Sequence, residues 1–236
     1  ACRVARTILL GSAPDVRSQD VRGIESSRIR LGTVIPEPAK DGKRWECQTS
    51  ISNDALATLT KSLSYLYSAT DRYWYDTRPT LRKTAEDRKR GLEDSTVEME
   101  IEGKMKKDWE RGKSLTGLHI CPASDDVPDT SDGVRLVVLM PKKGTEKDLR
   151  KAALNILKNR GNSPRSYQNL LVFLTPEEGS IDSVKDAMRE YLAWKSISDD
   201  AEALNLDYTQ RNEVAKAIRN AENKLEAQLN EAFSKL

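Results

Sequence analysis

The fold is decided by the stretch VRLVVLM at residues 134–140. Its aliphatic and β-branched residues, stopped by Pro141, are typical of a strand buried on both faces. The next segment, 149–157, places apolar residues at i, i+3, i+4, i+7 and i+8, which predicts an amphipathic helix. A second apolar run at 169–174 ends at a Thr-Pro pair. Strand, helix and strand joined by short loops predict a βαβ unit with parallel strands and a right-handed crossover.

Two further elements precede this unit. Residues 117–122 predict a strand that runs into a loop. Residues 97–109 fit two periods, because alternating glutamates favour a strand whereas apolar residues at every fourth position favour a helix. The helical spacing covers more residues, so we predict a helix, weakened by Gly103.

The end of the chain, from residue 181, predicts helices. In its last part apolar residues step by threes and fours over about three heptads, a spacing close to that of a coiled coil. The residues with this spacing are Val214, Ile218, Ala221, Leu225, Leu229, Ala232 and Leu236. This helix packs either on its own domain or across a homo-oligomer, and the pattern supports the two alternatives about equally.

The first 91 residues predict a different kind of module. Helical spacing is found at 4–9, 21–31 and 52–66, with residues 39–50 forming a loop. Two aromatic runs then flank Ala69-Thr70-Asp71, which is typical of a β-hairpin, and Pro79 begins another helix. Helices followed by an aromatic hairpin are the order of a winged-helix module.

We therefore predict a mixed α/β chain in three parts. Residues 1–91 form a winged-helix-like module, residues 92–180 a small α/β domain with a parallel βαβ sheet, and residues 181–236 an amphipathic, coiled-coil-like helical tail. The tail packs on the α/β domain or on a partner.

Composition narrows the class of protein. Lys and Arg number 39 against 37 Asp and Glu, so the net charge of +2 indicates no partner by itself. No window approaches the roughly 18 consecutive apolar residues of a membrane span, which excludes an integral membrane protein. Three cysteines without a CxxC pair favour reduced thiols, and we expect a cytoplasmic protein. The chain begins as if inside a helix, so we expect it to be a piece of a longer protein.

The motifs of catalysis are not found in the sequence. Neither GxxxxGK[ST] nor GxGxxG occurs, and the acids that follow the apolar run at 170–174 favour a helix N-terminus, capped by Thr175, over a Mg²⁺ site. The acidic stretch 125–133 lacks the spacing and closing glutamate of a Ca²⁺ loop. His119 shares a strand face with Cys121 but has no second ligand nearby. We predict no catalytic residues, no metal and no cofactor in this segment.

The positive signal is a basic run at 72–90. Six basic residues at 78–90 outnumber two acids, and three aromatic residues lie just before them. Basic and aromatic side chains together are suited to phosphate contacts and base stacking. The predicted nucleic-acid-binding residues are Lys61, Arg72, Tyr73, Arg78, Arg82 and Lys83. The alternative is a solvated helix with internal ion pairs, with Trp74 in the core of the hairpin.

A second basic feature is the turn at residues 159–165. Arg160 and Arg165 lie on a Gly/Pro-shaped turn and are candidates for a phosphate contact, including one made in trans on a neighbour's nucleotide. The favoured alternative is a helix that ends at Gly161 with both arginines on the surface.

Several segments together resemble a known family, in the family's order and over nearly the whole chain. They are residues 4–14 (VARTILLGSAP), 23–25 (GIE), 28–32 (RIRLG), 72–77 (RYWYDT), 119–124 (HICPAS), 160–165 (RGNSPR) and 191–195 (YLAWK). They resemble domain-of-unknown-function family 499, large bacterial and archaeal predicted ATPases of the AAA+ superfamily, often encoded near DNA methylases and helicases in anti-phage islands. The resemblance implies a region downstream of the ATPase core. The family's phosphate-binding motif has no counterpart here.

The leading hypothesis is a non-catalytic C-terminal region of an AAA+-like ATPase that binds DNA or a partner in anti-phage defence. Its expected partners are DNA, the upstream ATPase domain and, through the last helix, a second copy. One alternative is a structural or oligomerisation module that binds only protein. Another is a degenerate P-loop-like domain that kept its sheet and lost its chemistry.

Overall fold

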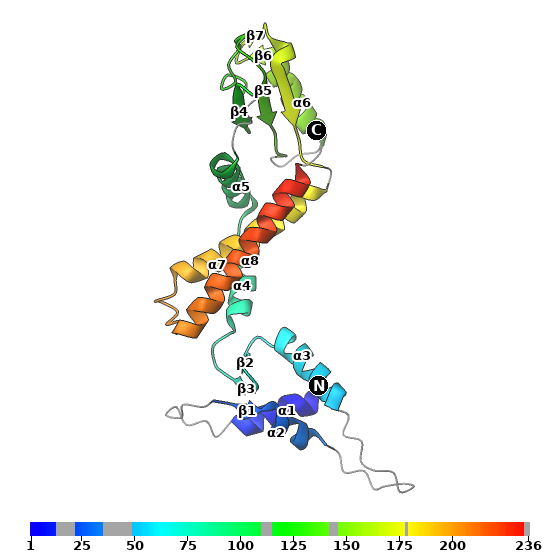
Figure 1. Cartoon of the computed structure of the whole chain (residues 1–236), viewed down its shortest axis with the longest axis vertical. Helices are drawn as coiled ribbons and strands as arrows, with labels where there is room; N and C mark the ends of the chain where they lie inside the picture. Colours follow the sequence, from blue (N-terminus) through cyan, green and yellow to red (C-terminus); the bar gives the residue numbers. More distant parts are fainter. Residues whose placement is uncertain (13–21, 35–48, 110–114, 142–145, 178, 234–236) are drawn as a thin grey trace, which may run out of the picture. The chain divides into compact units, whose positions relative to one another are not determined.

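The computed structural model describes residues 1–12, 22–34, 49–109, 115–141, 146–177 and 179–233. The chain divides into two compact units, which we call unit 1 (residues 1–84) and unit 2 (residues 85–236) (Figure 1).

Unit 1 combines helices with a small antiparallel sheet. Its elements are α1 (Cys2–Ser12), β1 (Ile24–Glu25), α2 (Ser26–Thr33), α3 (Thr49–Ser62), β2 (Leu66–Ala69) and β3 (Arg72–Tyr75), followed by the start of α4 (Leu81–Arg90). The strands lie in the order β1-β3-β2. The predicted hairpin is confirmed, with Thr70 and Asp71 as its turn and Thr70 at a positive φ of 56°.

The helical spacing read from the sequence places the core of unit 1. Val4 and Ile8 of α1 are one turn apart and both buried, and they pack with Ile29, Leu56 and other apolar residues in one cluster. Leu9, which the spacing assigned to the same face, is 55% exposed.

The predicted helix at 21–31 is wrong at its start. Gly23 turns the chain with φ 79°, and Ile24 and Glu25 then pair with Tyr73 and Arg72 of β3. The helix begins only at Ser26. Two residues are too few to show the alternating pattern of a strand. The strand β1 forms because the edge of β3 is there to pair with it. Most of the predicted loop at 39–50 lies outside the described residues, and α3 already begins at Thr49.

Unit 2 is built on a parallel sheet. Its strands β4 (Gly117–Ile120), β5 (Arg135–Val138) and β8 (Leu171–Leu174) lie in the order β4-β5-β8. The helix α6 (Glu146–Lys158) connects β5 to β8, whose parallel register runs from Arg135↔Leu171 to Val138↔Leu174. The predicted βαβ unit is therefore confirmed. A short hairpin of β6 (Asn159–Arg160) and β7 (Ser163–Pro164), and the 3₁₀ helix η1 (Gln168–Leu170), follow α6.

Apolar residues on both faces of this sheet pack against helices. On one face Val137 and Leu139 pack with Ile156 of α6. On the other, Val138 and Met140 pack with α5 (Asp94–Asp108), α7 (Ser180–Asp199) and α8 (Tyr208–Ala232). The alternation of residues 137–140 between the two faces confirms a strand buried on both sides. The predicted parts 92–180 and 181–236 thus share one hydrophobic core.

The helices α7 and α8 lie side by side as an antiparallel pair (Figure 1). Asp207 caps α8 by accepting the Gln210 N–H at 2.8 Å, which explains why the second helix begins there. Val214, Leu225 and Leu229 are buried, and Ile218 is half-buried. The predicted cap at Thr175 is wrong, since α7 begins after Gly179, which has a φ of 77°. No helix in the described part of the chain is both long and apolar enough to cross a membrane.

Candidate nucleic-acid interface

The net charge of the whole chain is close to zero, but the two units carry net charges of opposite sign. Residues 1–84 contain 14 Lys and Arg against 9 Asp and Glu, a net charge of +5. Residues 85–236 contain 25 against 28, a net charge of −3. A polyanion is therefore attracted to unit 1 and not to unit 2.

Hydrogen bonds gather four of the predicted residues at one end of α3. The backbone N–H of Thr80 donates to the Ser64 carbonyl at 2.7 Å, and that of Asp76 donates to the Tyr65 carbonyl at 3.1 Å. Residues 76–80 therefore lie against the segment that follows α3. Basic residues are carried here by the last turn of α3, the connecting loop and the first turn of α4. We call Lys61, Arg78, Arg82 and Lys83 the basic cluster.

The loop that carries Arg78 is held in shape. The Asp76 Oδ1 accepts the N–H of Thr77 at 2.6 Å and that of Arg78 at 3.3 Å. The Tyr67 hydroxyl donates to the Pro79 carbonyl at 2.9 Å. The Lys61, Arg78 and Arg82 side chains are exposed, and Lys83 is half-buried. Positive charge at the C-terminal end of α3 also favours the helix dipole, so the cluster is compatible with a stable fold.

The Arg72 guanidinium, by contrast, makes hydrogen bonds inside unit 1. Its Nη1 lies 2.7 Å from the Glu25 carboxylate, its Nη2 donates to the Gly23 carbonyl at 2.8 Å, and its Nε donates to the Arg22 carbonyl at 3.0 Å. These bonds fasten β1 and the Gly23 turn to β3. Arg72 thus has a structural role in unit 1, and the phosphate contact predicted for it stays a prediction.

The aromatic residues of the hairpin divide between its two faces. Tyr73 and Tyr75 are half-buried and pack against the core of unit 1, and the nucleic-acid contact of Tyr73 stays a prediction. Trp74 lies on the opposite face and stacks on Tyr67, with ring centroids 5.9 Å apart and planes at 17°. Trp74 is half-buried and Tyr67 is its register partner, so this contact lies within the hairpin.

The second half of the basic run belongs to unit 2. Arg88 pairs at 2.7 Å with Asp200, which lies just after α7. Lys89 pairs at 2.7 Å with Asp186 on α7. Arg90 lies 3.9 Å from Glu86 within α4. These three residues of the basic run therefore make ion pairs within unit 2.

Sequence reasoning missed two arginines of α2. Arg28 is exposed, and the Arg30 Nε donates to the Asn53 Oδ1 of α3 at 3.1 Å, which links the two helices. The signal was present in the alternation of Arg28, Ile29 and Arg30, in which only the isoleucine is buried. The solvent face of α3 presents small and polar side chains, including Ala57 and Thr58.

The two arginines of the 159–165 turn have opposite environments. Arg160 is exposed on the β6–β7 hairpin. The Arg165 side chain is 0% exposed and donates to four backbone carbonyls. The acceptors are Ile156 and Pro128 at 2.9 Å, Val127 at 3.1 Å and Ser124 at 3.2 Å. Arg165 therefore holds the loop after β4 in place, and the expectation that it lies on the surface is wrong.

The acidic stretch 125–133 is ordered by the protein itself. Asp129 accepts the N–H groups of Ser166 and Tyr167, which lower its pKa. Asp132 pairs with the buried Arg135, and hydrogen bonds from Thr130 and Arg135 lower its pKa. Among the described residues, no group of three His, Cys, Asp or Glu is placed to hold a metal ion.

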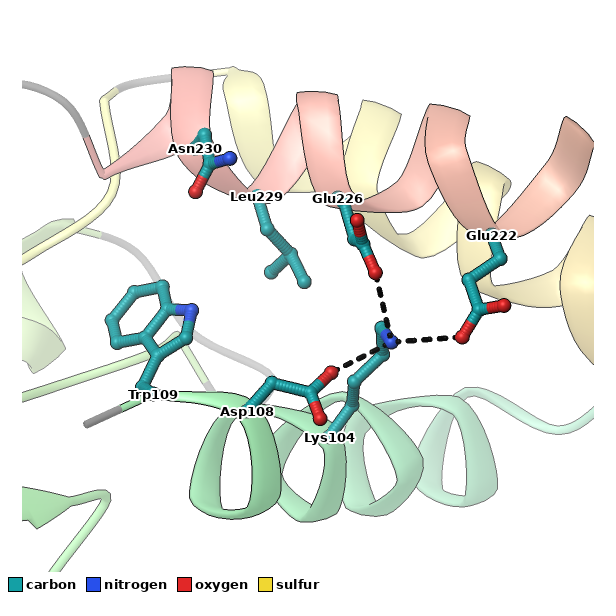
Figure 2. Close-up of a pocket in the computed structure, with 7 residues that line it drawn as sticks. All are labelled: Lys104, Asp108, Trp109, Glu222, Glu226, Leu229 and Asn230. Atoms are coloured by element: carbon teal, nitrogen blue, oxygen red, sulfur yellow. Dashed lines mark hydrogen bonds and ion pairs between the residues drawn. The ribbon is translucent and has the colours of Figure 1, made fainter. Parts of the chain in front are cut away.

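A pocket of about 360 Å³ between α5 and α8 has its polar groups satisfied internally (Figure 2). The Lys104 ammonium lies 2.7 Å from Asp108, 3.4 Å from Glu222 and 3.6 Å from Glu226. Burial acts to lower the pKa of Lys104, but the hydrogen bonds and charges of Asp108 and Glu222 outweigh it and raise the pKa. This network joins α5 to α8 and serves the fold.

No family model matches the chain, and no curated protein or solved structure matches it.

Proposed function

We propose that unit 1 is a winged-helix-like module that binds nucleic acid through the basic cluster. Its element order, α1-β1-α2-α3-β2-β3, and its sheet order, β1-β3-β2, are those of a winged helix. Two helices joined side by side offer a helix to a groove, and the hairpin flanks it. The α2–α3 pair is joined here by the Arg30–Asn53 bond and by the Thr33 and Ser52 hydroxyls, 3.3 Å apart.

The observation that supports the proposal is that hydrogen bonds bring the segments that carry the basic cluster together, in the unit that holds the positive charge. Lys61, Arg78, Arg82 and Lys83 come from three separate segments to one end of α3. Such a cluster neutralises phosphates without reading sequence, so the affinity it provides depends strongly on salt.

In this proposal the chain is the non-catalytic C-terminal region of an AAA+-like ATPase in prokaryotic anti-phage defence, as the family resemblance implies. DNA binding by unit 1 would bring the parent ATPase to its substrate. The isolated chain should then bind DNA and show no ATP turnover.

The test compares two triple variants that remove the same charge. Arg78→Ala/Arg82→Ala/Lys83→Ala removes three members of the basic cluster, and Arg88→Ala/Lys89→Ala/Arg90→Ala removes three basic residues of unit 2. Duplex DNA affinity is measured by fluorescence anisotropy across a salt series. The first variant should flatten the log–log salt slope by about 0.9 for each phosphate that it no longer neutralises, for all sequences alike. The second should keep the slope of the unmodified chain.

Two outcomes would contradict the proposal. An unmodified chain that binds neither duplex nor single-stranded DNA at low salt has no nucleic-acid function. If both variants flatten the slope equally, the basic cluster is not the contact surface.

The second candidate function is docking of protein alone. It is favoured by apolar side chains exposed on the helices of unit 1, where Leu10 is 74%, Leu31 76% and Ile51 59% exposed. Contiguous exposed apolar side chains mark protein interfaces. Absence of DNA binding at all salt concentrations together with a self-association that Leu31→Ser abolishes would favour this function.

A further inference from the structure

The strand β4 lies at the edge of the parallel sheet, next to β5 alone among the described strands. The Cys121 N–H donates to the Val138 carbonyl at 2.8 Å, and the register pairs His119 with Val137. Because alternate residues of a strand turn their N–H and C=O groups to opposite sides, Leu118 and Ile120 direct theirs away from β5. Two residues of backbone donors and acceptors therefore face the open edge.

A groove of about 730 Å³ lies beside β4. Residues 117–122 line one side of it, and Glu102, Lys106 and Trp109 line the other. Natural edge strands are commonly guarded by charged side chains, proline or a bulge. The four residues of β4, GLHI, include no lysine, no acid and no proline. Among the described residues, no strand pairs with this side of β4.

The charge of the groove indicates what fits it. The Lys106 ammonium lies 2.7 Å from the Glu102 carboxylate, so these two charges offset each other. Asp126 lines the groove where β4 ends, is exposed, and leaves a net charge of −1. A phosphate would be repelled by this charge, whereas a basic side chain is attracted to it.

We infer that β4 is a docking edge for an extended peptide segment of a partner protein, which adds to the sheet as a fourth strand. Backbone hydrogen bonds to Leu118 and Ile120 would supply affinity, as in other cases of strand addition. An apolar side chain of the peptide would pack on Leu118 and Trp109, and a Lys or Arg would lie near Asp126. This site is in unit 2 and does not depend on nucleic-acid binding by unit 1.

The test selects binders from a displayed library of random ten-residue peptides against the full chain. Affinities of the enriched peptides are then measured by fluorescence anisotropy for two variants of one residue. Leu118→Pro removes the outward N–H, and an edge position tolerates proline because that N–H does not bond β5. Leu118→Ala shortens the side chain and keeps the N–H.

The expected result is that Leu118→Pro weakens binding about three- to tenfold more than Leu118→Ala, the value of one hydrogen bond. The enriched peptides should also be rich in Lys or Arg. Asp126→Asn should weaken the binding of these peptides about two- to fivefold. Circular dichroism confirms that the variants are folded.

Three results would overturn the inference. One is a selection that yields no binder, and another is a set of binders that do not distinguish proline from alanine at residue 118. The third is a chain that dimerises in light scattering and becomes monomeric with Leu118→Pro, because the edge is then occupied by a second copy.

Discussion

Replacing Arg165 by alanine should destabilise unit 2 severely, although the residue is not a member of the basic cluster. The guanidinium is fully buried and donates to the carbonyls of Ser124, Val127, Pro128 and Ile156. The first three belong to the loop between β4 and β5, and the fourth belongs to the last turns of α6. Removing one side chain therefore releases two elements that pack on the same face of the sheet.

The magnitude follows from the four acceptors. Hydrogen bonds to a charged group contribute about 1.5–3 kcal/mol each, so an additive sum would reach roughly 6–12 kcal/mol. The additive sum is too large, because the cavity left by the side chain is lined by carbonyls. Water that enters this cavity can donate hydrogen bonds to some of these carbonyls. We expect a loss of about 3–5 kcal/mol in the free energy of unfolding, the range seen when one partner of a buried charged network is removed.

The assay is urea unfolding combined with hydrogen exchange, read on peptides of unit 2. Arg160→Ala is the matched control, since Arg160 is an exposed arginine on the same turn, and it should change the free energy of unfolding by no more than about 0.5 kcal/mol. Arg165→Lys keeps the charge but offers three donors in place of a planar fork, so it should fall between the two. A loss below about 1 kcal/mol for Arg165→Ala would refute this structural role.

Three further predictions concern unit 2. Because the pKa of Lys104 is raised in the folded protein, its ion pairs stabilise unit 2 fully below pH about 10.4, and this stabilisation is lost as the pH rises through the folded pKa. Lys104→Gln should therefore lower the free energy of unfolding by about 1 kcal/mol at neutral pH, and the melting temperature of this variant should fall less at alkaline pH. Burial and two neighbouring arginines lower the pKa of His119, so stability should be full above pH about 6.5 and decline as the pH falls toward the folded pKa. An unchanged decline in His119→Gln would contradict that assignment. Leu225→Ala should cost about 2–5 kcal/mol in urea unfolding because Leu225 is buried in the main core, and Ile218→Ala should cost less because Ile218 is half-buried.

Local spacing was enough to predict the helices and strands that carry strong apolar patterns. The helices at 149–157 and 97–109 and the strands at 134–140 and 169–174 were predictable, because a side-chain period of 3.6 or 2 states which face is buried. The parallel βαβ unit could be predicted from these elements, because two strands connected by a helix usually pair in parallel. The cluster formed by Lys61, Arg78, Arg82 and Lys83 was also predicted as a candidate surface from its charge, although the sequence could not show that hydrogen bonds gather it at one end of α3.

What only the tertiary structure decided depends on neighbours that are distant along the chain. Arg72 and Arg165 look like exposed cations in the sequence, yet carbonyls up to 50 residues away occupy their donors. The strand β1 exists because β3 offers it an edge, and α5, α7 and α8 share a core with the sheet because their apolar faces meet there. A charged or apolar side chain specifies what it can bind, but burial and pairing are properties of the contacts around it. The sequence therefore determined the elements with strong apolar patterns, whereas the fold determined which arginines are buried.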